Sequence, residues 1–461
     1  MRRLVIVSNR VAPLTVRQAA SAGGLAVGVH AALAESGGLW FGWSGQVVDE
    51  PGPVRQQRAG SISYLLTDLS ESEHAGYYAG FSNRALWPTF HYRLDLATFE
   101  RVHYEAYRAV NRRLAGELAR VLRPTDHVWV HDYHLIPFGR ELRRLGVANR
   151  IGFFLHVPFP APEVFVVLPW HRSLAEDLCA YDVIGFQTAS HTRQFVDYAL
   201  EELGGELVAN GNLEVGDRRL TVGAFPIGID VDDVQRMAAS DEARRNAYAL
   251  TATLQRRQLV IGVDRLDYSK GIPERLLSFE TLLREHPDWR GGVTLVQISA
   301  PSREDVPEYQ HLRTTVEGLA GRINGRLGAA EWTPVRYVNR TYSRRALAGF
   351  YRIAAVGLVT PLRDGMNLVA GEYVAAQDPE RPGVLVLSRF AGAAEILEGA
   401  VIVNPYDIDK TATALHHALA MPIEERRERH ARLLHSQRAH DVHSWRERFL
   451  QALAGERAAQ S

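Results

Sequence analysis

Residues 356–377 read VGLVTPLRDGMNLVAGEYVAAQ, and this stretch decides the predicted fold. It predicts a buried strand over its first five residues, then a tight loop, and then a helix that begins near Asn367. The start of such a helix offers backbone N–H groups and the positive end of the helix dipole, which together suit a diphosphate. Asp364 and Glu372 flank this point, and their carboxylates can accept hydrogen bonds from sugar hydroxyls. The stretch therefore predicts a site for a nucleotide sugar.

Working outward, the composition limits the class of protein. A chain of 461 residues has room for roughly two to four domains. Its hydrophobic content of 46%, charged content of 23% and formal net charge of +0 are those of a globular enzyme without a nucleic-acid or anionic-membrane partner. We find no signal peptide and no apolar run near the roughly 20 residues that a membrane span needs, so we expect a cytoplasmic protein. The one cysteine, Cys179, lies in an apolar stretch and is expected to be a core residue.

Lysine is almost absent from the chain. Of the 53 lysines and arginines, only Lys270 and Lys410 are lysine. A lysine kept in such a chain is expected to do what a guanidinium cannot, such as placing a compact charge on a phosphate. Lys410 follows two aspartates at a predicted helix start, where a surface role suffices. Lys270 shares the loop RLDYSKG with Arg265 after a predicted strand, so this loop is a second candidate diphosphate ligand.

Strands and helices alternate along the chain in two series. We predict strands at 4–7, 126–132, 151–155, 182–187, 220–225, 259–263, 293–298, 336–338, 356–360, 384–387 and 401–403. The segment PIGID between the fifth and sixth strands is typical of a linker. The alternation predicts an α/β protein with two doubly wound, Rossmann-like domains that face a central cleft. We place these domains at 1–230 and 231–445, and expect a C-terminal helix at 446–461 to pack back on the first domain.

Polar residues follow two strands of the first series. His131, Asp132 and His134 end one strand, and His156 follows the next. Ligands of open α/β sheets bind at the carboxyl ends of strands, so these side chains are predicted to lie at a binding edge. The HDYH spacing suits a metal site at a strand end poorly, and we predict no metal.

Two segments keep two explanations open. The glycine pair Gly23-Gly24 in SAGGLAVG would let the backbone approach a ligand, although a simple turn accounts for such a pair as well. Residues 77–92, YYAGFSNRALWPTFHY, hold six aromatic side chains without a helix or strand period, and we expect an ordered loop over a cleft. Their rings could stack on a sugar or could form a hydrophobic patch beneath the loop.

Long motifs identify a family. The segments SNRVAP, SAGGLAVG, LWFGWSG, LWPTFHY, VWVHDYHL, FFLHVPFP, RLDYSKG and LVTPLRDGMNLVAGEYVAAQ resemble, in order and spacing, those of the trehalose-6-phosphate synthase family. The resemblance runs from about residue 4 to residue 445. It implies a retaining glycosyltransferase of GT-B architecture, with no cofactor, that transfers glucose from a nucleoside diphosphate to the anomeric oxygen of glucose 6-phosphate.

The resemblance also implies the roles of individual residues. Matches to acceptor-binding positions are Arg10, Tyr78, Trp87, Asp132 and Arg303. Matches to donor-binding positions are Gly23, Gly24, His156, Arg265, Lys270, Tyr342, Asp364, Asn367, Leu368, Val369 and Glu372. The catalytic set implied is Asp132, His156, Arg265, Lys270 and Asp364. In the mechanism usually described for the family, the leaving phosphate takes the acceptor's proton, and the sequence identifies no carboxylate nucleophile.

Departures from the family pattern leave some points open. The family often has lysine at the position of Gly371, glutamate at the position of Asp264, and varied residues around Tyr342, so UDP-glucose and GDP-glucose both remain candidate donors. Alternatives are a pseudo-disaccharide phosphate synthase with a cyclitol donor, a non-catalytic sugar-phosphate sensor, and a phosphorylase or epimerase. The matching His156 and Asp364 and the unbroken motifs favour the synthase. The sequence leaves open whether the chain forms a homo-oligomer.

Overall fold

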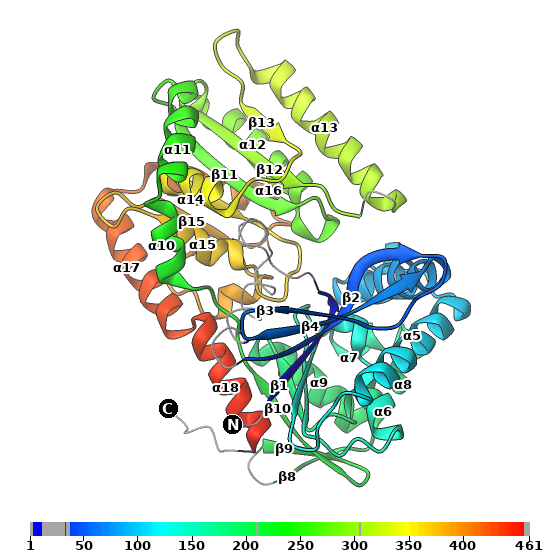
Figure 1. Cartoon of the computed structure of the whole chain (residues 1–461). Helices are drawn as coiled ribbons and strands as arrows, with labels where there is room; N and C mark the ends of the chain where they lie inside the picture. The colour runs from blue at the N-terminus through cyan, green and yellow to red at the C-terminus, as the bar shows by residue number, and fades with distance from the viewer. Residues whose placement is uncertain (1–2, 12–32, 34–36, 209–210, 304–305, 456–461) are drawn as a thin grey trace. The chain divides into compact units, whose positions relative to one another are not determined.

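Two mainly parallel sheets organise the structure (Figure 1). The computed structural model describes residues 3–11, 33, 37–208, 211–303 and 306–455. Within this part of the chain, residues 3–227 and 443–455 form one compact unit, and residues 228–442 form the other. Each unit contains one of the two sheets and its own buried apolar core.

The first unit contains a ten-stranded sheet in the order β3-β4-β2-β1-β5-β6-β7-β10-β9-β8. Its strands are β1 (Leu4–Arg10), β2 (Gly38–Val48), β3 (Arg55–Ala59), β4 (Ile62–Ser70), β5 (His127–His131), β6 (Ile151–Phe154), β7 (Val183–Phe186), β8 (Glu206–Val208), β9 (Asn212–Val215) and β10 (Arg218–Ala224). The strands from β4 to β10 in this order pair in parallel, whereas β3, β8 and β9 add antiparallel edges.

The helices of the first unit connect these parallel strands. They are α3 (Glu71–Glu73), the π-helix η1 (His74–Leu86), α4 (Trp87–Phe90), α5 (Arg101–Ala119), α6 (Phe138–Arg144), α7 (Pro162–Phe165), α8 (His171–Leu178) and α9 (Ala189–Glu202). β6 and β7 read IGFF and VIGF, and all of their residues are buried. Continuous apolar runs of this kind are typical of parallel strands covered on both faces.

The second unit contains a six-stranded parallel sheet in the order β13-β12-β11-β14-β15-β16. The strands are β11 (Gln258–Arg265), β12 (Val293–Ala300), β13 (Val335–Val338), β14 (Val356–Val359), β15 (Val384–Ser388) and β16 (Val401–Val403). The helices are α10 (Val231–Ala238), α11 (Asp241–Leu254), α12 (Ile272–Glu285), α13 (Pro307–Leu327), α14 (Arg344–Ile353), α15 (Leu368–Ala376), α16 (Ile408–Ala420) and α17 (Ile423–Ala439).

The strand orders confirm the predicted Rossmann-like sheets. In the second unit the chain runs outward from β11 through β12 to β13, then returns to β14 on the other side of β11. The first unit has the same reversal between β1 and β5. Ligands of doubly wound sheets bind beyond the carboxyl ends of the strands at such a reversal, so each unit has one preferred binding edge.

The aromatic segment at 77–92 is helical, and the prediction of a loop is wrong. It forms most of η1 and α4, and the backbone N–H of Trp87 donates to the carbonyl of Ser82, five residues earlier. Bonding from i to i+5 gives more residues per turn than an α-helix, so the sequence shows no 3.6-residue period. Gly76 and Gly80 allow the close packing on α5, because a Cβ atom there would lie 2.5 Å from Ala106 and 2.6 Å from His103.

The C-terminal helix α18 (Val442–Ala454), drawn in red in Figure 1, begins before the predicted residue 446. Its Phe449 ring stacks on Trp129 of β5 at 4.5 Å, and Trp445 lies 4.9 Å from the same ring. Gly152 and Gly185 make room for Phe449, since a Cβ at either position would come within 2.8 Å of its ring. The helix thus belongs to the core beneath the first sheet. None of the described helices is long and apolar enough to span a bilayer.

Candidate active site

The reversal between β11 and β14 brings together the charged residues predicted for the second half. Lys270 follows β11, and Asp364 and Asn367 follow β14. The Nζ of Lys270 donates to Oδ2 of Asp364 at 2.5 Å, and the side-chain amide of Asn367 donates to the same oxygen at 3.0 Å. The side chains of Lys270 and Asp364 are 11% and 15% exposed. These three residues form a half-buried cluster at the preferred edge of the sheet.

Helix α15 starts at this cluster. Its N-cap residue, Asn367, has φ 76° and ψ 84°, a left-handed conformation that asparagine tolerates better than most residues. Its side chain turns to Asp364 and makes no capping bond, so it leaves the first N–H groups of α15, near Leu368 and Val369, to other acceptors. The Oδ1 of Asn367 is buried without a hydrogen-bond partner among the described residues. This helix start suits an anionic ligand.

A fully buried arginine, Arg275, supports the loops that carry the cluster. Its guanidinium donates to the carboxylate of Asp264 at 2.5 Å, to Oε1 of Gln297 at 2.8 Å, to the hydroxyl of Thr360 at 3.0 Å and to the carbonyl of Lys270 at 3.3 Å. Asp264 and Gln297 lie in β11 and β12, Thr360 directly follows β14, and Lys270 lies in the loop after β11. Burial raises the pKa of Asp264, and the charge of Arg275 opposes that rise. Arg275 therefore fixes three strand ends and one loop with a single side chain.

Backbone contacts also lock the two loops together. Gly271 has φ 63°, and a Cβ there would lie 2.3 Å from the carbonyl of Thr360. The backbone N–H of Leu362 donates to the carbonyl of Ser269 at 2.8 Å, and the carboxylate of Asp267 accepts from the N–H of Ser269 at 3.0 Å. The loop of Lys270 and the loop of Asp364 therefore form one rigid platform.

Two further predicted arginines lie on neighbouring strand ends. Arg265 is exposed at the end of β11, and its guanidinium donates to the hydroxyl of Ser302 at 3.3 Å. Arg303 follows β12 and lies 3.5 Å from the buried carboxylate of Asp267, and it also donates to the hydroxyl of Tyr309. Arg265 is thus exposed, whereas a phosphate at Arg303 would have to share the guanidinium with Asp267.

The remaining predicted donor residues lie on α15 and on the loop after β13. Glu372 is half-buried, and burial raises its pKa while Arg344 lowers it. The hydroxyl of Tyr342 accepts from Arg340 at 2.6 Å, and the Arg340 guanidinium lies 4.3 Å from the centre of the Tyr342 ring. Gly371 is pressed against α17, because a Cβ there would lie 2.4 Å from Oε1 of Gln437. A lysine in place of Gly371 would therefore require the Gln437 side chain to move.

The binding edge of the first unit is built around two buried histidines and the carboxylate of Asp132. The Nδ1 of His131 and the Nε2 of His156 lie 3.0 Å apart, and burial lowers the pKa of His156 to about 3 and that of His131 well below its usual value. Asp132 has φ 76° and accepts the backbone N–H of His156 at 3.2 Å. Strain at a non-glycine residue of this kind is found mostly at functional sites. Both histidines are therefore neutral at pH 7.

Aromatic rings line the same unit near β1 and η1. Tyr78 stacks on His134 with ring centres 5.8 Å apart and lies 5.4 Å from Trp43. The guanidinium of Arg10, at the end of β1, lies 5.9 Å from the Trp43 ring. Trp87 is 5% exposed and packs on His91. Its ring is therefore buried and does not offer an open face on which a sugar could stack. Gly23 and Gly24 lie outside the described residues.

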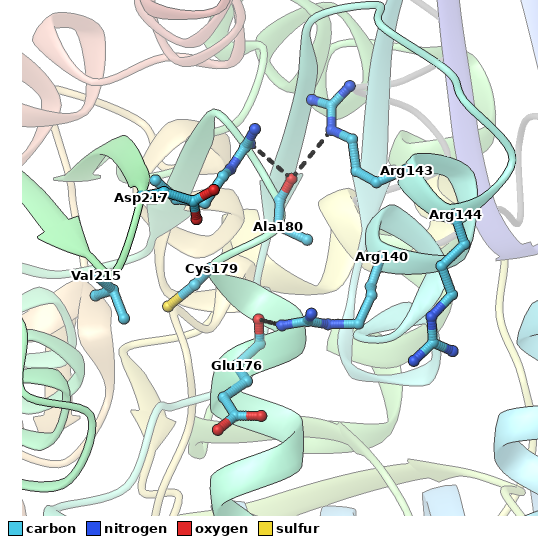
Figure 2. Close-up of a pocket in the computed structure, with 9 residues that line it drawn as sticks. Arg140, Arg143, Arg144, Glu176, Cys179, Ala180, Val215 and Asp217 are labelled. Carbon is cyan, nitrogen blue, oxygen red and sulfur yellow. Dashed lines mark hydrogen bonds between the residues drawn. The ribbon is translucent and has the colours of Figure 1, made fainter.

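A separate cavity of about 440 Å³ in the first unit holds none of these residues (Figure 2). Its lining includes Arg140, Arg143, Arg218 and Cys179. The guanidinium groups of Arg143 and Arg218 donate to the carbonyl of Ala180. Burial raises the pKa of the Cys179 thiol to about 12, so this cysteine is protonated at pH 7 and is not a nucleophile.

Sequence reasoning missed Arg275 and Gln187. Gln187 follows β7, and its side-chain amide N lies 3.5 Å from Nδ1 of His156. One signal for Arg275 was available, because it lies within the first turns of α12, where the helix dipole disfavours a positive charge. An arginine at such a position indicates a compensating carboxylate nearby.

One Rossmann-like sheet carries a cationic site at a helix start, and the other carries a polar edge around two neutral histidines. Two sheets of this kind define a GT-B glycosyltransferase. The model of glycosyltransferase family 20 matches residues 3–455. A trehalose-6-phosphate synthase of Klebsiella pneumoniae is 49% identical over 453 residues, which cover 98% of this chain and 95% of the relative. The chain therefore belongs to glycosyltransferase family 20, a family of retaining enzymes.

Solved structures agree with this assignment. A UDP-forming α,α-trehalose-phosphate synthase from Burkholderia xenovorans, in complex with glucose 6-phosphate, has a TM-score of 0.94 and 49% identity, covering 98% of this chain and 100% of that one. A structure from E. coli bound with UDP-2-fluoro glucose has a TM-score of 0.94 and 47% identity, covering 98% of each chain. The predicted family and the predicted GT-B fold are both confirmed.

Replacing Arg275 by Met is expected to lower the free energy of unfolding by about 3–5 kcal/mol, because Asp264 would remain buried without its counter-ion. Urea unfolding of the second unit measures the change. The double variant Arg275→Met, Asp264→Leu should recover part of the loss. The control Arg432→Met, whose side chain is 53% exposed, should change stability by less than about 0.5 kcal/mol. An Arg275→Met protein as stable as this control would contradict the assigned role.

Acid should destabilise the first unit through His156. Its pKa is about 3 in the folded protein and about 6.5 in the unfolded chain, so between these values the unfolded chain binds a proton that the folded one does not. The free energy of unfolding should therefore fall as the pH falls from 6.5, by about 1.4 kcal/mol per pH unit for this residue. Urea unfolding from pH 8 to pH 5 should give a shallower slope for His156→Asn than for the wild type. Equal slopes would contradict the buried, neutral histidine.

Proposed function

We propose that this chain is a glucosyltransferase that makes α,α-trehalose 6-phosphate from a nucleoside diphosphate glucose and glucose 6-phosphate, with retention at the transferred carbon. The observation that carries the proposal is the cluster of Lys270, Asp364 and Asn367 at the start of α15. It combines a compact cation and free helix N–H groups, which suit a diphosphate, with a carboxylate, which suits sugar hydroxyls. The names of the curated relatives support the same reaction.

The proposed donor is UDP-glucose. Similar solved structures are described as UDP-forming, and one contains a UDP-sugar analogue. Glu372, half-buried on α15, would accept hydrogen bonds from the ribose hydroxyls, and the loop of Tyr342 would lie near the base. GDP-glucose, which the sequence left open, is the second donor to be tested.

Charge explains how the proposed reaction proceeds. The bond between C1 of glucose and the β-phosphate oxygen breaks, and the acceptor's anomeric oxygen bonds to C1 on the same face. The acceptor's proton passes to the leaving phosphate oxygen, so atoms and charges balance without a metal or a cofactor. Arg265, Lys270 and the N–H groups of α15 stabilise the charge that the diphosphate gains. We assign Asp364 to the transferred glucose, and the family resemblance assigns His156 to the same sugar.

Most of the residues assigned to the acceptor lie on the first unit, and Arg303 lies on the second. Asp132 and Tyr78 would orient the hydroxyls of glucose 6-phosphate, and Arg10 at the end of β1 would bind its phosphate. Trp87 would contribute to the acceptor site as a buried ring that packs on His91. Arg303 would bind the phosphate after giving up part of its contact with Asp267. Both substrates are phosphorylated metabolites of the cytoplasm, where we place the reaction.

A donor panel tests the proposed function directly. UDP-, GDP- and ADP-glucose and a nucleoside diphosphate cyclitol are each incubated with glucose 6-phosphate, and NMR identifies the product linkage. We expect UDP-glucose to give an α,α-1,1-linked phosphate, with activity unchanged by a chelator. Transfer from the cyclitol alone, or no transfer from any donor, would contradict the proposal.

The two lysines form a natural pair of variant and control. Lys270→Met should lower kcat/KM for the donor by about 10²–10³, because it removes a preorganised charge from the leaving group. Lys410→Met, at a side chain that is 86% exposed beside Asp407, should leave kcat/KM unchanged. Steady-state kinetics with varied UDP-glucose measure both. Near-normal turnover of Lys270→Met would remove this lysine from the diphosphate site.

A further inference from the structure

Three strand ends of the first unit meet at one imidazole. His131 ends β5, His156 follows β6, and Gln187 follows β7. The Nε2 of His156 lies 3.0 Å from Nδ1 of His131, and its Nδ1 lies 3.5 Å from the amide nitrogen of Gln187. The backbone N–H of His156 donates to Asp132, which fixes the base of the side chain. Both ring nitrogens of His156 therefore face a defined partner.

Gln187 has one allowed orientation. Its Oε1 accepts the backbone N–H of Ile227 at 3.0 Å, so its amide nitrogen must face His156. The reversed amide would place NH₂ hydrogens against the N–H of Ile227. Gln187 is 2% exposed, so water does not compete for these groups. Because the amide presents hydrogens to Nδ1 of His156, a proton on Nδ1 would be opposed.

The proton of His156 then belongs on Nε2. There it would be donated to Nδ1 of His131, and the proton of His131 would lie on its own Nε2, which is buried without a hydrogen-bond partner among the described residues. Burial lowers the pKa of both rings, which agrees with two neutral imidazoles joined by one hydrogen bond. Phe154, at 4.6 Å, and Trp445 of α18, at 6.2 Å between ring centres, pack beside His156 and restrict its rotation.

We propose that His131 and Gln187 are positioning residues that hold His156 in the tautomer protonated on Nε2, so that Nδ1 meets the transferred hexose as a hydrogen-bond acceptor. The proposal rests on the proposed function, in which His156 contacts that sugar. The bond from Gln187 is long at 3.5 Å, so a sugar hydroxyl can replace it as a better donor. A site of this kind recognises a hydroxyl and rejects a sugar that lacks it.

Spectra of the free protein test the tautomer without any substrate. Full-length protein with ¹⁵N-labelled histidine gives long-range ¹H–¹⁵N correlations that distinguish Nδ1 from Nε2 protonation, and the His156→Asn variant assigns the signals. We expect His156 to be protonated on Nε2 throughout pH 6–8. A proton on Nδ1, or titration within this range, would overturn the proposal.

Gln187→Glu is the informative variant. One carboxylate oxygen can still accept from Ile227, while the other would accept a proton from Nδ1 and reverse the tautomer. We expect the reversed tautomer in the spectra and a loss of about tenfold or more in donor kcat/KM. The control Gln56→Glu, on an exposed strand of the same unit, should change neither. An unchanged tautomer in Gln187→Glu would overturn the positioning role.

A pair of His131 variants keeps the proposal testable should Gln187→Glu fail to fold. His131→Asn retains an acceptor for Nε2–H of His156 and should keep most activity, whereas His131→Leu removes it and should lose about tenfold. Equal activity of the two would overturn the role of His131. A further outcome is that the spectra show the expected tautomers while Gln187→Glu leaves donor kcat/KM unchanged. That result would contradict the proposed contact between His156 and the sugar, and it would leave the tautomer assignment intact.

Discussion

A buried ion pair supports the binding edge of the second unit. Arg275 and Asp264 have side-chain exposures of 0% and 2%, and the guanidinium also bonds to groups on two neighbouring strand ends and on the loop of Lys270. Removing two charges from water is costly, and a hydrophobic pair would often be as stable. The pair instead directs three strand ends and a loop toward one geometry. Such preorganisation is what stabilisation of a leaving group requires, because the charges must be in place before the bond breaks.

The two units share the order of their parallel strands around the reversal, but the side chains at the two binding edges differ in charge. At the reversal in the second unit, a lysine, an arginine and a helix start concentrate positive charge where a diphosphate would gain negative charge. At the reversal in the first unit, burial keeps His131 and His156 neutral, and Asp132 is fixed in a left-handed conformation. Sugar hydroxyls need oriented donors and acceptors more than they need charge. One fold thus provides an edge with a lysine and an arginine and an edge with two neutral histidines and a carboxylate, because the side chains at the strand ends differ.

Arginine and lysine serve different roles in this structure, in which lysine is scarce. Arginine serves the surface and the buried network, where its planar fork can bond several acceptors at once, as Arg275 does. Lys270, whose side chain is 11% exposed, places a compact ammonium against a carboxylate beside the start of α15, whereas Lys410 pairs with Asp407 at a side chain that is 86% exposed. A guanidinium there would be larger and would require planar partners.

The amino-acid sequence by itself determined the alternation of strands and helices, the start of α15 at Asn367 and Leu368, the position of Lys270 in a loop after a strand, and the family. These features are local, because the strand period, the helix signals and the motifs depend on residues that are close together in the sequence. Only the tertiary structure decided that Lys270 meets Asp364, 94 residues later, that Arg275 is buried, and that Gln187 and His131 share His156. It also decided that η1 is a π-helix and that Trp445 packs beside His156. Such contacts depend on strand order and burial, which bring distant residues together and which no local pattern records.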